Sequence, residues 1–177
     1  MVKSYLRIFD SQALVACQTN PMTAQQFMSE HVQRMGNSVA HFVANTEPSL
    51  LTWTQLAPGS ERSRTILELV GECVNANRIF AALLRGESPG RPADIDLTSE
   101  SAQMEIVKSS DELAAAINYM NEEDFERDFI HPVRGPLKGK ILAMGAYRNM
   151  AYHSGQINFI QILGGDHKFH MPPTWLN

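Results

Sequence analysis

The sequence predicts an all-α protein that forms one antiparallel four-helix bundle. Apolar residues recur at steps of three and four along three long segments, and this is the period of an amphipathic helix. No region shows the strict alternation of polar and apolar residues that is typical of a half-buried strand. A chain of 177 residues with 44% apolar content can bury one substantial core, so we expect a single domain.

The predicted domain spans residues 1–177 in three parts. Residues 1–20 have no sustained period and end before a proline, so they are predicted to be an N-terminal extension. Residues 21–165 are predicted to form the helical bundle, and residues 166–177 a C-terminal tail. The tail is expected to pack over the mouth of the bundle through three side chains, those of Phe169, Met171 and Trp175.

The first helix is predicted over residues 23–45, where apolar residues share one helical face. They are Met28, Val32, Met35, Val39, Phe42 and Val43. A proline after this segment ends the helix. Residues 50–60 then read as a loop, in which Trp53 and Leu56 are expected to pack on the end of the bundle.

The second helix is predicted to begin after Ser63 or Thr65, either of which can serve as the N-cap, and to end at Gly86. Its apolar face comprises Ile66, Leu69, Val70, Cys73, Ala76, Phe80, Leu83 and Leu84. Residues 86–98 contain two glycines and two prolines. Because prolines break a helix, this segment is predicted to be a long surface connection.

The third and fourth helices are predicted over residues 109–120 and 140–163. The third opens with a Ser-x-x-Glu pattern, which is typical of a capping box. The acidic run over residues 122–128 is interpreted as a solvated helix end and loop. Residues 131–139 carry two prolines and two glycines, so they are predicted to form a turn or a short hairpin.

Charge and composition exclude several classes of function. The chain has 15 Lys and Arg against 19 Asp and Glu, a net charge of -4, so no cationic surplus favours binding to nucleic acid. No apolar run approaches the length of a membrane span or a signal peptide, and we expect a cytoplasmic protein with no membrane partner. Cys17 and Cys73 are too few for a disulfide framework and are expected to be reduced.

Polar residues interrupt two of the apolar faces. Glu72 lies beside the apolar face of the second helix, and Asn149 and His153, four residues apart, fall within the inner face of the last helix. Because an unpaired polar group is costly to bury, these side chains should meet one another, water or a cation. They therefore predict either a water-containing polar network or a metal site between facing helices.

Two segments resemble the DinB-like family. The sequence from His153 to Ile157, HSGQI, looks like the H-x-G-Q-[IL] signature of the family's last helix. Residues 66–80, ILELVGECVNANRIF, resemble the second helix of the family, which carries a metal-binding histidine. Together with the helix order, the resemblance covers residues 20–165 and implies a four-helix bundle of the DinB-like type.

The resemblance also implies a divalent metal, zinc or nickel, held by three histidines. In this chain the three positions fall on Glu72, Asn149 and His153. A carboxylate is an acceptable replacement for imidazole, whereas a neutral amide at Asn149 should weaken metal binding. A shift of the alignment by one residue would place Cys73 at the first position. Gln156 is expected to orient the imidazole of His153.

Three functions follow as hypotheses. Relatives of the family suggest a metal-dependent enzyme for thiol-dependent transfer or hydrolysis, in which the metal activates a low-molecular-weight thiol or water for attack on a small-molecule substrate. The second hypothesis is a non-catalytic bundle that binds a small ligand beside a degenerate metal site. The third is a structural module that binds a partner protein. Family members often pair through bundle faces, so a homodimer is expected.

Overall fold

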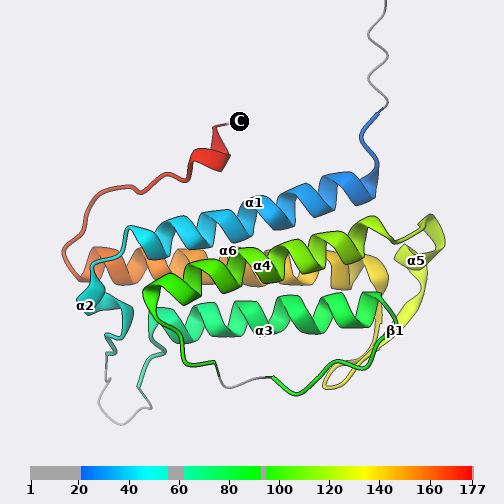
Figure 1. Cartoon of the computed structure of the whole chain (residues 1–177), viewed down its shortest axis with the longest axis horizontal. Coiled ribbons are helices and arrows are strands. Elements are labelled where there is room, and N and C mark those ends of the chain that lie inside the picture. Colours follow the sequence, from blue (N-terminus) through cyan, green and yellow to red (C-terminus); the bar gives the residue numbers. More distant parts are fainter. Residues whose placement is uncertain (1–20, 56–61, 93–94, 177) are drawn as a thin grey trace, which may run out of the picture.

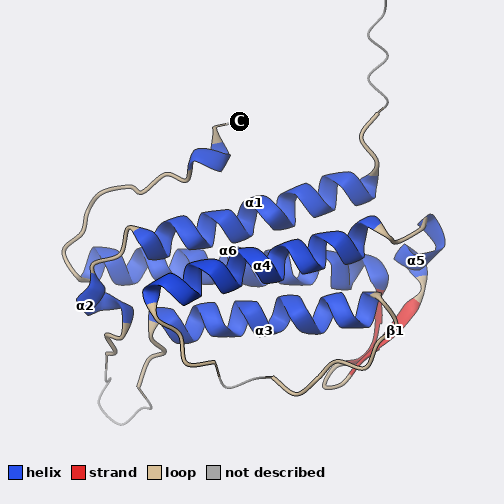
Figure 2. Ribbon diagram, viewed as in Figure 1, coloured by secondary structure: helices blue, strands red, loops and turns tan. Residues whose placement is uncertain are grey.

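The computed structural model describes residues 21–55, 62–92 and 95–176. In this part of the chain, the four long helices are α1 (Ala24–Ala44), α3 (Ile66–Leu84), α4 (Ser99–Asn118) and α6 (Gly139–Leu163). Shorter elements are α2 (Pro48–Leu51), α5 (Glu122–Glu126), strands β1 (Asp128–His131) and β2 (Gly135–Lys138), and the 3-10 turn η1 (Pro173–Trp175). The predicted all-α class is confirmed in the broad sense, since only one small hairpin accompanies the helices (Figure 2).

The long helices pack side by side around a common core (Figure 1). Helices α1 and α3 each pack against both α4 and α6, so α1 and α3 occupy opposite corners. Figure 1 shows that α1 is antiparallel to α4 and that α3 is antiparallel to α6. Helices α3 and α4 run in the same direction, because the connection between them returns along the length of α3.

The starts of α1 and α3 agree with their capping sequences. Thr23 and Thr65 are the N-caps, and each accepts a hydrogen bond from a backbone N–H three residues later. The side chains of Gln26 and Glu68 complete the two capping boxes. The cap of α3 is therefore Thr65 and not the alternative Ser63.

The predicted start of the third helix was wrong. Helix α4 begins directly after Thr98, whose hydroxyl caps the backbone N–H of Ser101. Ser109, which the sequence suggested as a helix start, and its neighbour Ser110 are buried in the middle of α4, and their hydroxyls donate to the carbonyl of Ile106. Serines at caps and serines that bond back to the helix have the same local sequence signature, so periodicity alone did not separate them.

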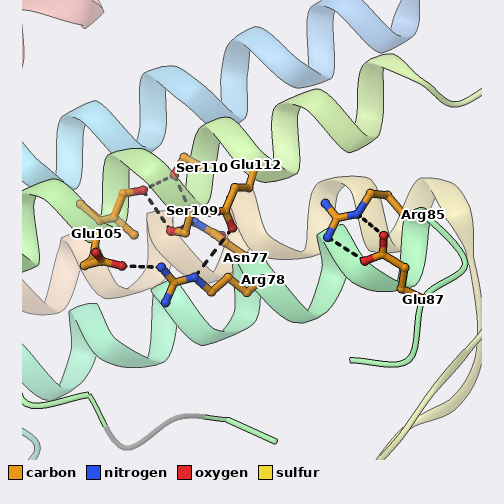
Figure 3. A network of polar contacts seen from close by, with 9 residues as sticks. Asn77, Arg78, Arg85, Glu87, Glu105, Ser109, Ser110 and Glu112 are labelled. Atoms are coloured by element: carbon orange, nitrogen blue, oxygen red, sulfur yellow. Dashed lines mark hydrogen bonds and ion pairs between the residues drawn. The ribbon is translucent and has the colours of Figure 1, made fainter. Parts of the chain in front are cut away.

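A buried polar layer joins α3 to α4 within the apolar core. The amide nitrogen of Asn77 donates to the hydroxyls of Ser109 and Ser110, each at 3.1 Å (Figure 3). On the surface of the same helix pair, Arg78 forms ion pairs with Glu105 and Glu112 (Figure 3). The buried hydrogen bonds of Asn77 fix the register between α3 and α4, because sliding either helix would leave these polar groups without their partners.

The remaining elements close the ends of the bundle. Strands β1 and β2 pair antiparallel, which confirms the hairpin expected over residues 131–139, and they lie near the C-terminal end of α3 (Figures 1 and 2). The acidic run forms α5 and the start of β1 instead of remaining a loop. The described residues contain no helix that is long and apolar enough to cross a membrane.

The C-terminal tail lies along α1 and not over the mouth of the bundle. The indole of Trp175 donates to the hydroxyl of Ser38 at 3.0 Å and packs edge-on against Phe42. Phe169 and Met171 remain exposed. In the loop after α1, Trp53 is partly buried against the core as expected, whereas Leu56 and the extension over residues 1–20 lie outside the described residues.

The close contact of α1 with α4 predicts a strong effect of Gly36→Ala. A Cβ at Gly36 would lie 2.2 Å from the hydroxyl oxygen of Ser110, so the helices would have to separate. We expect Gly36→Ala to lower the free energy of unfolding by about 1–3 kcal/mol in urea denaturation. Gly155→Ala on α6 is the matched control, because no described atom lies within 4 Å of its added Cβ.

Gly155→Ala should leave stability unchanged or raise it by up to about 1 kcal/mol, the difference in helix propensity. Equal stability of the Gly36→Ala variant and the unmodified protein would contradict the described packing of α1 on α4.

Candidate functional site

The imidazole of His153 is buried on the inner face of α6, with only 4% of the residue exposed. Its Nδ1 lies 2.6 Å from Oε1 of Gln156. Since an amide oxygen only accepts hydrogen bonds, Nδ1 carries the hydrogen and donates it. The amide nitrogen of Gln156 in turn donates to the Tyr152 hydroxyl at 3.4 Å. Gln156 therefore orients the imidazole, as the sequence predicted.

The other imidazole nitrogen faces a carboxylate from α3. Nε2 of His153 lies 3.4 Å from Oε1 of Glu72, and it is buried without a hydrogen-bond partner among the residues described. Burial lowers the pKa of His153; the hydrogen bond to Gln156 opposes this shift, and the charge of Arg64 adds to it. At neutral pH the imidazole is therefore uncharged, and the lone pair of Nε2 points toward a carboxylate.

Glu72 also pairs with a residue that sequence reasoning missed. The guanidinium of Arg64 forms an ion pair with Oε2 of Glu72. Arg64 precedes the N-cap of α3, where the positive end of the helix dipole disfavours a cation. Because the side chain of Arg64 is 61% exposed and water can solvate it there, no signal in the sequence specified this ion pair.

Asn149 lies beside the pair formed by Glu72 and His153 without bonding to either. Its amide nitrogen points to the sulfur of Cys73 at 3.9 Å, and its side chain lines the same cleft as that of Glu72. Burial raises the pKa of the Cys73 thiol to about 12, so this residue is an uncharged core thiol. The structure thus brings Glu72 and His153 into contact and leaves Asn149 next to them.

These residues fit a divalent cation only in part. In residues 21–55, 62–92 and 95–176, no three His, Cys, Asp or Glu side chains are close enough together to hold a metal. The separation of 3.4 Å between Nε2 and Oε1 nevertheless matches two ligands of one tetrahedral ion, which lie about 3.3 Å apart when each bond is about 2.0–2.1 Å. Two protein ligands suit only a weakly held ion.

A cleft with a volume of about 1280 Å³ opens beside this pair. It lies between α3 and α6 and reaches the hairpin, and Glu72 and Asn149 both line it. Ile79 and Phe80 of α3, together with Leu137 and Ile141, give it an apolar surface. A concave, mostly apolar surface with a few polar groups at one place is typical of a small-molecule site.

Sequence reasoning also missed the contribution of the hairpin to this cleft. His131 and Arg134 come from the hairpin and Arg148 from α6. The hairpin was predicted, but its position over the groove between α3 and α6 depends on how far the helices extend. No local signal in residues 131–139 specifies that position.

Comparison with known proteins supports the fold and does not identify a function. No protein-family model matches the chain, and no curated protein matches it. The fold is similar to the crystal structure of a conserved protein from Enterococcus faecalis, with a TM-score of 0.60 and 15% sequence identity. The similarity covers 80% of this chain and 97% of that one.

The contacts of His153 predict how its pKa responds to substitution. Gln156→Leu should lower the pKa further, because it removes a hydrogen bond that stabilises the protonated ring. Arg64→Gln should raise it, because it removes a nearby positive charge. Arg62→Gln is the control, since Arg62 pairs with Glu68 and not with Glu72. NMR titration of the imidazole resonances measures the pKa of His153 in each of the three variants.

Because the pKa of folded His153 lies below that of the unfolded chain, its contribution to stability is present above about pH 6.5 and is lost as the pH falls. A pKa of His153 above 6.5 in the unmodified protein would contradict this description of the site.

Proposed function

We propose that this protein binds a divalent cation through Glu72 and His153 and a small organic molecule in the adjoining cleft. In this proposal it is a DinB-like bundle that acts as a metal-dependent enzyme in thiol-dependent transfer or hydrolysis. Zinc or nickel suits the imidazole, and a carboxylate is compatible with either metal.

One observation carries the proposal: the buried Nε2 of His153 has no hydrogen-bond partner in the described part of the chain and faces the carboxylate of Glu72. A lone pair and a carboxylate oxygen at this distance repel each other unless a proton or a cation lies between them. Since burial disfavours protonation of the imidazole, a metal cation is the better candidate.

Each residue of this site would have a separate role in binding the cation and the substrate. Glu72 and His153 would hold the cation, Gln156 fixes the tautomer that turns the Nε2 lone pair toward Glu72, and Asn149 would contribute an amide oxygen or bind a water. A bound metal of this kind lowers the pKa of a thiol or a water, so that a nucleophile is available at neutral pH. The apolar part of the cleft would bind the substrate and exclude water from it.

The ion pair of Arg64 with Glu72 supports the alternative function. A guanidinium that neutralises Glu72 can replace a metal cation, and the protein would then be a non-catalytic bundle that binds a small ligand beside a degenerate metal site. Homodimer formation and a cytoplasmic location remain predictions from the sequence. For the dimer, the exposed Tyr152, Phe159 and Ile162 on α6 offer an apolar contact surface.

Substitution of the three residues separates the two functions. His153→Ala should abolish binding of zinc or nickel, Glu72→Gln should weaken it strongly, and Asn149→His should strengthen it by adding a third imidazole ligand. Binding should also weaken as the pH falls through about 6.5, because a ligating imidazole must be unprotonated. Titration calorimetry on protein without a histidine tag measures each affinity.

Ala151→His is the matched control, since it adds a histidine to the exposed side of α6 two residues further along. If Asn149→His binds zinc and nickel no more tightly than Ala151→His while both variants keep the fold, the metal-binding proposal is wrong. The ligand-binding bundle with Arg64 at Glu72 would then be the better account.

A further inference from the structure

The hairpin end of the cleft presents a hydrogen-bond donor with a fixed direction. Nδ1 of His131 accepts hydrogen bonds from the backbone N–H groups of Val133 and Arg134, at 3.1 and 3.2 Å. Burial and the charge of Arg134 lower the pKa of His131, so the ring is neutral and its hydrogen is on Nε2. Nε2 forms no hydrogen bond with the described residues, and His131 lines the cleft.

Two of the arginines that line the cleft are not neutralised. Four arginines line the cleft, and two of them are paired, Arg62 with Glu68 and Arg64 with Glu72. The other two are Arg134 of the hairpin and Arg148 of α6, and neither forms an ion pair within the described ranges. The four arginines and two glutamates that line the cleft therefore give it a net charge of +2, although the chain as a whole has a net charge of -4.

The wall of the cleft beside the ring of His131 is apolar. Phe80 of α3 packs edge-on against the ring of His131, and Leu137 and Ile141 line the cleft beside them. An inorganic ion would gain nothing from this apolar surface, whereas an organic molecule would bury its hydrocarbon part there.

We propose that the hairpin end of the cleft binds an organic anion, whose charged head is held by Arg134, Arg148 and the Nε2–H of His131 and whose apolar body lies against Phe80 and Ile141. Guanidinium groups bind carboxylates and phosphates in the same bidentate manner, so the shared chemistry is an oxyanion head on an apolar body.

This inference deepens the proposed function by naming its substrate class, and it relies on that function only in assigning the cleft to the substrate. Arg148 precedes His153 by five residues on α6, a rise of about 7.5 Å along the helix axis. Because Ile141 lies on the opposite side of Arg148 from His153 along α6, the charged head of this ligand, and not its apolar body, is the part nearer to the pair formed by Glu72 and His153.

Titration calorimetry with three matched probes tests the inference on the full chain in the presence of EDTA. The probes are 1-naphthoate, 1-naphthyl phosphate and the neutral 1-naphthalenemethanol, which share one apolar body. We expect at least one anionic probe to bind at least about 10-fold more tightly than the neutral one, in line with hydrogen bonds to charged groups. Its affinity should fall as salt is added.

The preferred anion identifies the head group as carboxylate or phosphate. Arg134→Gln and Arg148→Gln should each weaken binding of that anion by at least about 10-fold. Lys108→Gln is the control, because it removes an exposed positive charge on α4, outside the cleft. Circular dichroism should show that all three variants retain the helical fold.

Equal affinity for the neutral probe, no binding of either anion at millimolar concentration, or equal weakening by Lys108→Gln would each overturn the inference. EDTA separates it from the metal-binding proposal. Anion binding in EDTA without any metal affinity would leave this inference intact and reject the metalloenzyme, and the reverse result would reject only the anion site.

Discussion

The candidate site depends on a single constraint, the burial of His153 between α3 and α6 with one nitrogen already bonded. Because Gln156 accepts the hydrogen of Nδ1, the tautomer is fixed and Nε2 must face Glu72 as an acceptor. Two acceptors that face each other repel unless a proton, a water or a cation lies between them. The two functional hypotheses differ in how the charge of Glu72 is balanced: by a divalent metal shared with Nε2 of His153, or by the guanidinium of Arg64 at the other carboxylate oxygen, Oε2.

The fold brings these groups together through the order in which its helices are packed. The connection after α3 returns along the length of that helix, so α4 runs parallel to α3 and α6 becomes the antiparallel neighbour of α3 (Figure 1). The apolar periods predicted α1, α3 and α6 closely, and Thr65 was one of the two caps offered for α3. The prediction failed at α4, because Ser109 looks like a helix start in the sequence, whereas in the core it accepts a hydrogen bond from Asn77, as Ser110 does.

The sequence predicted the candidate site residues on α3 and α6, because a polar residue that interrupts an apolar helical face can be recognised from residue spacing alone. Glu72 and His153 were found in this way, and so was the orienting role of Gln156. Asn149 lines the cleft, but its amide nitrogen contacts Cys73 and not Glu72 or His153, because this contact depends on side-chain rotation. Arg64, His131, Arg134 and Arg148 come from three distant parts of the chain and line one cleft, because of how α3, α6 and the hairpin pack, and no local pattern encodes that packing.

The most direct test of the central claim is anomalous X-ray scattering from crystals of the untagged protein grown with zinc or nickel. The account predicts one anomalous peak within bonding distance of both Nε2 of His153 and Oε1 of Glu72, at about 2.0–2.2 Å from each atom. A map with no peak there at saturating metal, and with Arg64 still paired to Glu72, would contradict it.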